Sequence, residues 1–247
     1  MKNSIIRNKN KLLIILFWIL IWEVLSLIVN QEIYLPSPTS TFSALLNLLC
    51  EKETYITIFY STYRTLTGFF ISCTTGIILG YICGINKFFY NLLNPLVVII
   101  RTIPVMSIII IAIMWFRDTN VPIFVAFLMC FPIIWTNTVT GIISTDIKIL
   151  QMCRVYKIRK IRIIKSVYFY SALPYIKSAM ISDLGIGWKV TSAAEVLSLP
   201  KYSIGRFLYD SKVYLEIPSL FAWTIIIIFL SFIFENLLKV LFKGRVV

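Results

Sequence analysis

Long apolar segments separated by short polar ones dominate the hydrophobic pattern of this chain. A helix needs about 20 apolar residues to cross a bilayer. Six segments come close to that length, at residues 12–29, 63–85, 96–116, 121–143, 177–198 and 218–241. The pattern predicts an all-α integral membrane protein with about six transmembrane helices, forming a single membrane domain over residues 1–247.

Two of the six segments are open to a second interpretation. The first resembles a long signal peptide, but about 18 apolar residues exceed the usual ~7–15, so we favour an uncleaved span. The third is either one span or an interfacial helix over residues 88–103 that breaks at Pro104 into a shorter span. Between the first two segments, Pro36 and Pro38 are followed by Thr39 or Ser40 as a helix cap, which predicts a short surface helix outside the membrane.

The composition strengthens the membrane assignment and orients the chain. Hydrophobic residues make up 59% of the sequence and the mean hydropathy is +0.87, whereas soluble domains are about 45–50% apolar. With the N-terminus inside, seventeen Lys and Arg residues fall on inner segments and six on outer ones. Positive charge gathers on the cytoplasmic side, so both termini are predicted there. The net charge of +13 lies between spans, which argues against nucleic-acid binding.

A basic loop at about residues 144–176 separates the fourth and fifth segments. It contains no acid from residue 147 to 177, apolar residues are interleaved among its charges, and eight Lys or Arg residues occur there: Lys148, Arg154, Lys157, Arg159, Lys160, Arg162, Lys165 and Lys177. One interpretation is a docking surface for a cytoplasmic partner, with short helices between residues 149 and 164. The other is attraction to anionic lipid.

The second segment carries small residues four apart, on one helix face. These are Gly68, Ser72, Gly76, Gly80 and Gly84. Such a ladder lets another helix approach closely, which favours packing within the subunit. A role at the pore or at a subunit interface is the alternative.

The fifth segment is polar for a membrane helix, with Ser, Thr and Gly throughout. It also carries charges that are costly in lipid, Lys189 and Glu195. With Trp188, these residues are expected to face a translocation pathway or another helix. Asp183 and Glu235 lie closer to segment ends, and an interfacial position is expected for both.

Chemistry-bearing patterns are sparse. The chain has no histidine, its five cysteines show no CxxC spacing, and no nucleotide-binding loop, catalytic triad or paired carboxylates occur. We therefore expect no metal, no cofactor and no catalytic residue. A membrane-embedded enzyme is the least supported class.

Several motifs in order resemble the permease subunits of binding-protein-dependent ABC importers, most closely the nitrate, sulfonate, taurine and bicarbonate type. They are LPSP at 35–38, STYRTLTGF at 61–69, NPLVVIIRTIPVMSIIIIAIMWF at 94–116, ALPYI at 172–176, GWKVTSAAE at 187–195 and SIG at 203–205. The resemblance implies a type I importer fold in the bacterial plasma membrane. It also implies a second permease copy or homologous permease, two cytoplasmic ATPase subunits and an extracytoplasmic solute-binding protein.

The docking loop departs from the family's Glu-Ala-Ala…Gly signature. Counting back from Pro174 places those four positions on Gln151, Met152, Cys153 and Lys157. Because a lysine replaces the glycine that bends the family's loop, the bend is expected elsewhere. The neighbouring apolar Ile149, Leu150 and Val155, with Met152, are expected to fill an ATPase pocket.

The sequence leaves a stand-alone secondary transporter or channel as the alternative, using intramembrane Lys and Glu for ion coupling. An acid-free basic loop fits a docking surface better, since a secondary transporter needs none. The substrate is not readable beyond the family's range, which includes small anions and vitamin precursors.

Overall fold

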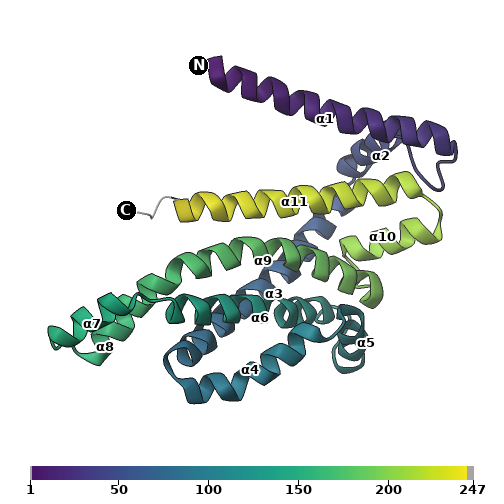
Figure 1. Ribbon diagram of the computed structural model, residues 1–247. Helices are drawn as coiled ribbons and strands as arrows, with labels where there is room; N and C mark the ends of the chain where they lie inside the picture. The colour runs from purple at the N-terminus through teal and green to yellow at the C-terminus, as the bar shows by residue number, and fades with distance from the viewer. Residues whose placement is uncertain (1, 244–247) are drawn as a thin grey trace.

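The computed structural model describes residues 2–243, with their side chains from Leu13 to Phe242, and no β-strand occurs among them. This confirms the all-α prediction (Figure 1). The helices are α1 (Lys2–Val29), α2 (Pro38–Cys50), α3 (Lys52–Ile85), α4 (Lys87–Thr102), α5 (Val105–Trp115), α6 (Val121–Ile143), α7 (Ile147–Val155), α8 (Lys160–Arg162), the π-helical η1 (Ile163–Tyr168), α9 (Phe169–Ser198), α10 (Ile204–Val213) and α11 (Ile217–Lys243).

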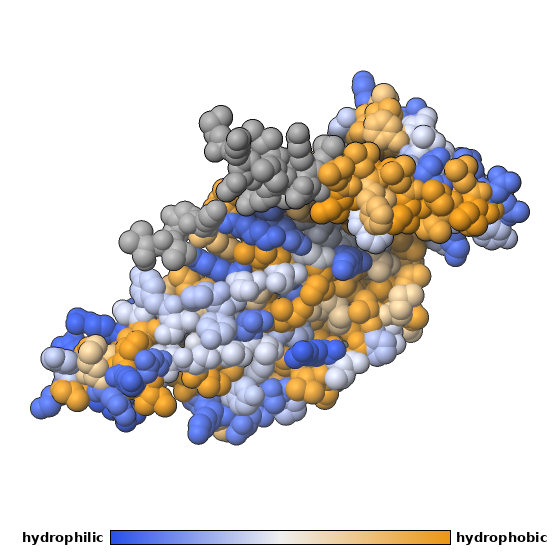
Figure 2. All heavy atoms as spheres, turned by 45° about the horizontal axis from the view of Figure 1, so that its top comes forward, coloured by the Kyte–Doolittle hydropathy of each residue, from blue (hydrophilic) through white to orange (hydrophobic). Residues whose placement is uncertain are grey.

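Helices α3, α6 and α9 form the centre of the molecule, and α11 and α10 lie against α9. The largest core cluster contains the buried Phe69, Ile134, Trp188 and Trp223 from four different helices. Helix α1 stands apart (Figure 1), and its apolar side chains are exposed along the described part, as the orange surface in Figure 2 shows. Trp22 stacks on Phe221 and so attaches one side of α1 to α11, while the exposed apolar surface of the helix is suited to lipid contact.

Among the described residues, three helices are long and apolar enough to cross a membrane: α3, α6 and α11. The pair α4 and α5 would add a fourth, but it is bent by 101°. The continuous span predicted over residues 96–116 is therefore wrong, and the break predicted at Pro104 is confirmed. Ile103 is extended, as expected of a residue that precedes proline, and α5 restarts directly after Pro104. Spans at α1 and α9 stay predictions.

The basic segment lies at one end of the helix bundle. Figure 1 shows α7 and α8 on the same side as the first turn of α1 and the last turn of α11. Figure 2 shows hydrophilic residues at that end, with hydrophobic residues among them. The arrangement agrees with the sides assigned from Lys and Arg counts, and the cytoplasmic position of both termini stays a prediction.

The small residues of α3 lie directly against α6. A Cβ atom built on any of the four glycines would approach an α6 atom to 2.7–2.9 Å, closer than real side chains pack. The α6 side chains in contact are Ala126, Ile134, Thr138 and Ile142, facing Gly68, Gly76, Gly80 and Gly84 in that order, and Ser72 is fully buried in the same row. The ladder therefore allows the close approach of two helices inside one subunit.

Gly76→Leu is expected to destabilise the protein by at least ~1–3 kcal/mol, because overpacking at this contact forces the two helices apart. Thr74→Leu is the matched control, since Thr74 lies on the exposed side of the same helix. The measurement is the thermal unfolding midpoint in detergent. Equal midpoints for the two variants would show that the ladder is not at a tight contact.

Candidate functional site

A row of polar side chains runs along the exposed face of α9. Ser178, Ser182 and Lys189 are exposed and Ser192 is half-buried. Their spacings of four, seven and three residues keep them on one side of a helix that turns 100° per residue. A polar row with an amine is a poor surface for lipid. This polar lane therefore faces water or another protein surface.

Lys189 lies beside a cavity of about 260 Å³ between α9 and α11. Glu235 lines the same cavity from α11 and forms an ion pair with Lys239 at 3.2 Å. Gly185 makes room for this carboxylate, since a Cβ there would lie 2.7 Å from the Glu235 Oε1. Trp188 also lines this cavity, but its side chain is only 1% exposed and its ring lies 5.9 Å from that of Phe234. It lies at the α9–α11 contact.

Glu195 is fully buried and forms the centre of a polar cluster. The Ser61 hydroxyl lies 2.9 and 2.8 Å from its two carboxylate oxygens, and Arg64 Nη1 donates to Oε1 at 2.9 Å. The backbone amide of Gly205 donates to Oε2 at 3.1 Å. Arg64 Nη1 also donates to the carbonyl of Tyr202 at 2.8 Å. The cluster joins α3, α9 and the first turn of α10.

Gly205 lies in the first turn of α10, directly after Ser203 and Ile204. An amide near a helix N-terminus favours an anion such as the Glu195 carboxylate. A Cβ at position 205 would lie 2.4 Å from the Cβ of Glu195, so the approach requires glycine. Ser203 caps the helix by accepting from the Arg206 amide at 3.2 Å. The buried cluster is thus a structural clasp that holds α10 on α9.

Sequence reasoning missed Arg64 in this cluster, because the count of basic residues placed it in an outer polar segment. Helix α3 begins at Lys52 rather than near residue 63, so Arg64 lies well inside a helix and is 4% exposed. The only signals in the sequence were its place in the STYR motif and an otherwise unpaired Glu195.

Asp183 was expected at the membrane interface, and this is wrong. It is fully buried in the core, and neither side-chain oxygen has a hydrogen-bond partner among the described residues. Its backbone carbonyl accepts from the Cys130 thiol at 3.8 Å. The error arose because α9 begins at Phe169, not near residue 177, which places Asp183 at the middle of a 30-residue helix.

Helix α7 presents an apolar face away from the rest of the molecule. Asp146 caps its N-terminus, with a side chain that accepts from the Lys148 amide at 2.8 Å. Ile149, Met152 and Val155 are 42%, 54% and 78% exposed. Exposed apolar side chains beside charged ones are typical of an interaction surface. We call these three residues the docking face, and the polar Gln151 is exposed beside them.

The opposite side of α7 is directed toward the protein. Cys153 is 3% exposed and Leu150 is half-buried. Of the four apolar residues expected to fill a partner's pocket, Leu150 is therefore the one already partly covered within this chain.

The bend after α7 occurs at Lys157, so the expectation that it must come from elsewhere is wrong. Lys157 adopts a left-handed conformation with φ of 51°. Its amide donates to the carbonyl of Arg154 at 3.0 Å, and the Ile158 amide donates to that of Cys153 at 2.9 Å. These two bonds form a Schellman motif, in which the left-handed residue is usually glycine. The lysine adopts this left-handed conformation at a cost of about 1–2 kcal/mol.

The chain after this bend is joined to α3. It continues through α8 into the π-helical η1, and the Tyr81 hydroxyl of α3 donates to the backbone carbonyl of Ile164. Short π-helical turns inside α-helices often occur at functional sites. The segment that follows α7 is thereby joined to α3 by a hydrogen bond and to α9 by the chain.

The apolar helices, the polar lane and the basic segment with an outward apolar face are features of a membrane protein with several spans. The chain belongs to the family described as binding-protein-dependent transport system inner membrane component, whose model matches residues 76–246. The resemblance inferred from the sequence motifs is thereby confirmed.

Curated relatives agree with this assignment. The chain is 30% identical to the nitrate import permease protein NrtB of Synechocystis sp., over 78% of this chain and 73% of the relative. It is 28% identical to the putative aliphatic sulfonates transport permease protein SsuC of Bacillus subtilis, over 84% and 76%. It is also 28% identical to the bicarbonate transport system permease protein CmpB of Synechococcus elongatus, over 80% and 74%. These relatives are transport permeases, in keeping with a non-enzymatic role for this chain.

Proposed function

We propose that this chain forms half of the substrate pathway of an ATP-driven importer. A second copy or a homologous permease supplies the other half. Two ATPase subunits dock on the complex, one of them on the docking face of α7 in this chain. An extracytoplasmic solute-binding protein delivers substrate from the opposite side. The observation that carries the proposal is the exposed polar lane on α9, the helix that follows the docking segment and η1 directly in the chain.

The substrate is proposed to be a small anion. Lys189 is the charged residue of the lane and its amine favours a negatively charged solute, while Glu235 in the same cavity is paired with Lys239. Relatives named for nitrate, sulfonate and bicarbonate transport support this class. A vitamin precursor is the second candidate within the family's range.

The test is ATP hydrolysis by the assembled complex in proteoliposomes. ATPase subunits are expected to respond to the loaded binding protein only when this permease is present. Uptake that is driven by an ion gradient and requires no ATPase subunit would instead support the secondary transporter or channel.

Lys189→Cys tests the pathway directly. In a background lacking the five native cysteines, a water-soluble thiol reagent is expected to label this position in at least one nucleotide state, because the lane is exposed to water there. Phe229→Cys is the control, since it lies on the exposed apolar side of α11 and is expected to face lipid and stay unlabelled. Absence of labelling at position 189 in every nucleotide state would contradict pathway lining.

A further inference from the structure

A second feature of the docking segment is a cavity of about 450 Å³ behind α7. Its walls come from α7, the bend, α8 and η1, and from Ile85, the last residue of α3. Because α3 is apolar and long enough to cross a membrane, the cavity lies beside the end of a candidate span. Lipid headgroups gather near the ends of membrane spans.

Three cations border the cavity: Arg154, Lys157 and Lys160. All three are exposed. None takes part in an ion pair within the described part of the chain, where the pairs involve Arg64, Arg206 and Lys239. The segment from residue 147 to 177 has no acid to neutralise them. An anion from outside the chain is the natural partner for such a group.

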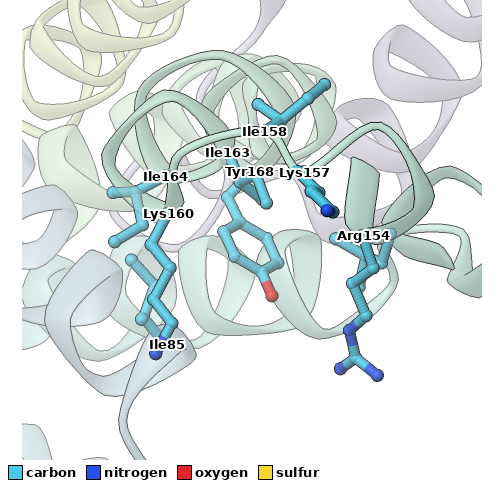
Figure 3. A pocket seen from close by; sticks show the side chains of 9 residues that line it. Ile85, Arg154, Lys157, Ile158, Lys160, Ile163, Ile164 and Tyr168 are labelled. Atoms are coloured by element: carbon cyan, nitrogen blue, oxygen red, sulfur yellow. The ribbon is translucent and has the colours of Figure 1, made fainter. Parts of the chain in front are cut away.

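The rest of the lining is apolar. Leu150, Ile163 and Ile164 join Ile85 along the walls. Figure 3 shows the Tyr168 ring at the centre, with its hydroxyl directed the same way as the ends of Lys160 and Arg154. The site thus combines cations and a hydroxyl with a hydrophobic wall, which fits a charged headgroup attached to a hydrocarbon chain.

The cavity and the docking face lie on opposite sides of α7. Leu150 and Arg154 border the cavity, whereas Ile149, Met152 and Val155 face outward. At 100° per residue, the mean directions of these two groups differ by about 180°. A partner bound to the docking face would leave the cavity accessible.

We propose that this cavity binds one anionic phospholipid of the cytoplasmic leaflet. The lipid phosphate accepts hydrogen bonds from Arg154, Lys157 and Lys160, and an acyl chain lies against Ile85, Ile163 and Ile164. Basic pockets beside membrane helices on the cytoplasmic side are suited to such headgroups. The lipid would bridge α7 and the end of α3, and so hold the docking segment against the bundle. This site is independent of the substrate and of ATPase binding.

The test uses the purified full chain without ATPase subunits, in micelles containing fluorescent phosphatidylglycerol. The pocket variant is Arg154→Gln with Lys157→Gln and Lys160→Gln. The matched control is Arg162→Gln with Lys148→Gln and Lys165→Gln, which removes the same charges from exposed positions of the same segment that do not line the cavity. Lipid affinity is expected to fall about tenfold further in the pocket variant than in the control, because direct charged hydrogen bonds are lost there.

A second variant tests the cavity independently, so that the result does not depend on correct folding of the first variant. Ile163→Trp fills the cavity and keeps every cation. It is expected to weaken binding of phosphatidylglycerol in the cavity, while the electrostatic attraction of the basic segment to an anionic micelle surface stays unchanged. Inorganic phosphate at millimolar concentration is expected not to displace the lipid, because it lacks the acyl chain. Equal losses in the pocket variant and its control, or displacement by inorganic phosphate, would overturn the proposal.

Discussion

Arg64→Ala is expected to leave little stably folded protein. The substitution removes the cation beside Glu195, with which Arg64 forms an ion pair at 2.9 Å, the two side chains being 5% and 1% exposed. An uncompensated buried charge costs about 3–5 kcal/mol. Because a folded protein typically has only ~5–15 kcal/mol in reserve, the loss is large. The thermal unfolding midpoint and the yield of monodisperse protein in detergent measure it.

The chain offers a matched control for this prediction. Arg206 pairs with Asp210 at 3.6 Å on the surface, where the side chains are 44% and 41% exposed. Arg206→Ala is expected to cost no more than about 1 kcal/mol. A double variant, Arg64→Met with Glu195→Leu, should be more stable than Arg64→Ala, since no charge is left unpaired. Equal stability of the Arg64 and Arg206 single variants would contradict the role of the buried cluster in holding α10 on α9.

Met152→Glu is expected to abolish ATPase association while the permease still inserts and folds. Met152 lies in the middle of the docking face and is 54% exposed, so the folded chain alone tolerates a carboxylate there. Placing an unpaired charge in an apolar interface costs ~2 kcal/mol or more, which weakens association at least about 30-fold. Co-purification and permease-dependent ATP hydrolysis measure the effect.

Met152→Leu separates loss of apolar contact from general damage to the helix. It keeps the volume and apolar character of the side chain, so association should stay close to the wild-type value. Met152→Lys should lose ATPase association as Met152→Glu does, because the cost comes from burying a charge and not from the sign of that charge. Normal association of both charged variants would remove the docking role from this face and favour lipid attraction alone.

Features set by local periodicity were predictable from the sequence. The four-residue spacing of the glycines predicted a packing face, and the structure supplies its partner, α6. Pro104 predicted a helix break because proline lacks an amide and constrains the residue before it, and α4 ends at Thr102. Both arguments depend only on neighbours along the chain.

Features set by tertiary contacts were not predictable. Arg64 and Glu195 are 131 residues apart, and no local signal pairs them. Asp183 was misplaced because hydropathy marks where an apolar segment lies but not where its helix starts. The left-handed conformation of Lys157 was missed because such positions usually hold glycine. The two backbone hydrogen bonds of the Schellman motif hold a lysine in the same conformation.

Cross-linking from the docking face tests most directly whether α7 joins this permease to an ATPase. Val155 is 78% exposed at the end of that face. In a background lacking the native cysteines, Val155→Cys carrying a short photoreactive group is expected to cross-link to an ATPase subunit in isolated membranes. Tyr170→Cys, exposed on α9 outside the docking face, should give no such product. Adducts of Val155→Cys with lipid alone, in membranes that contain the ATPase and import substrate, would contradict the account.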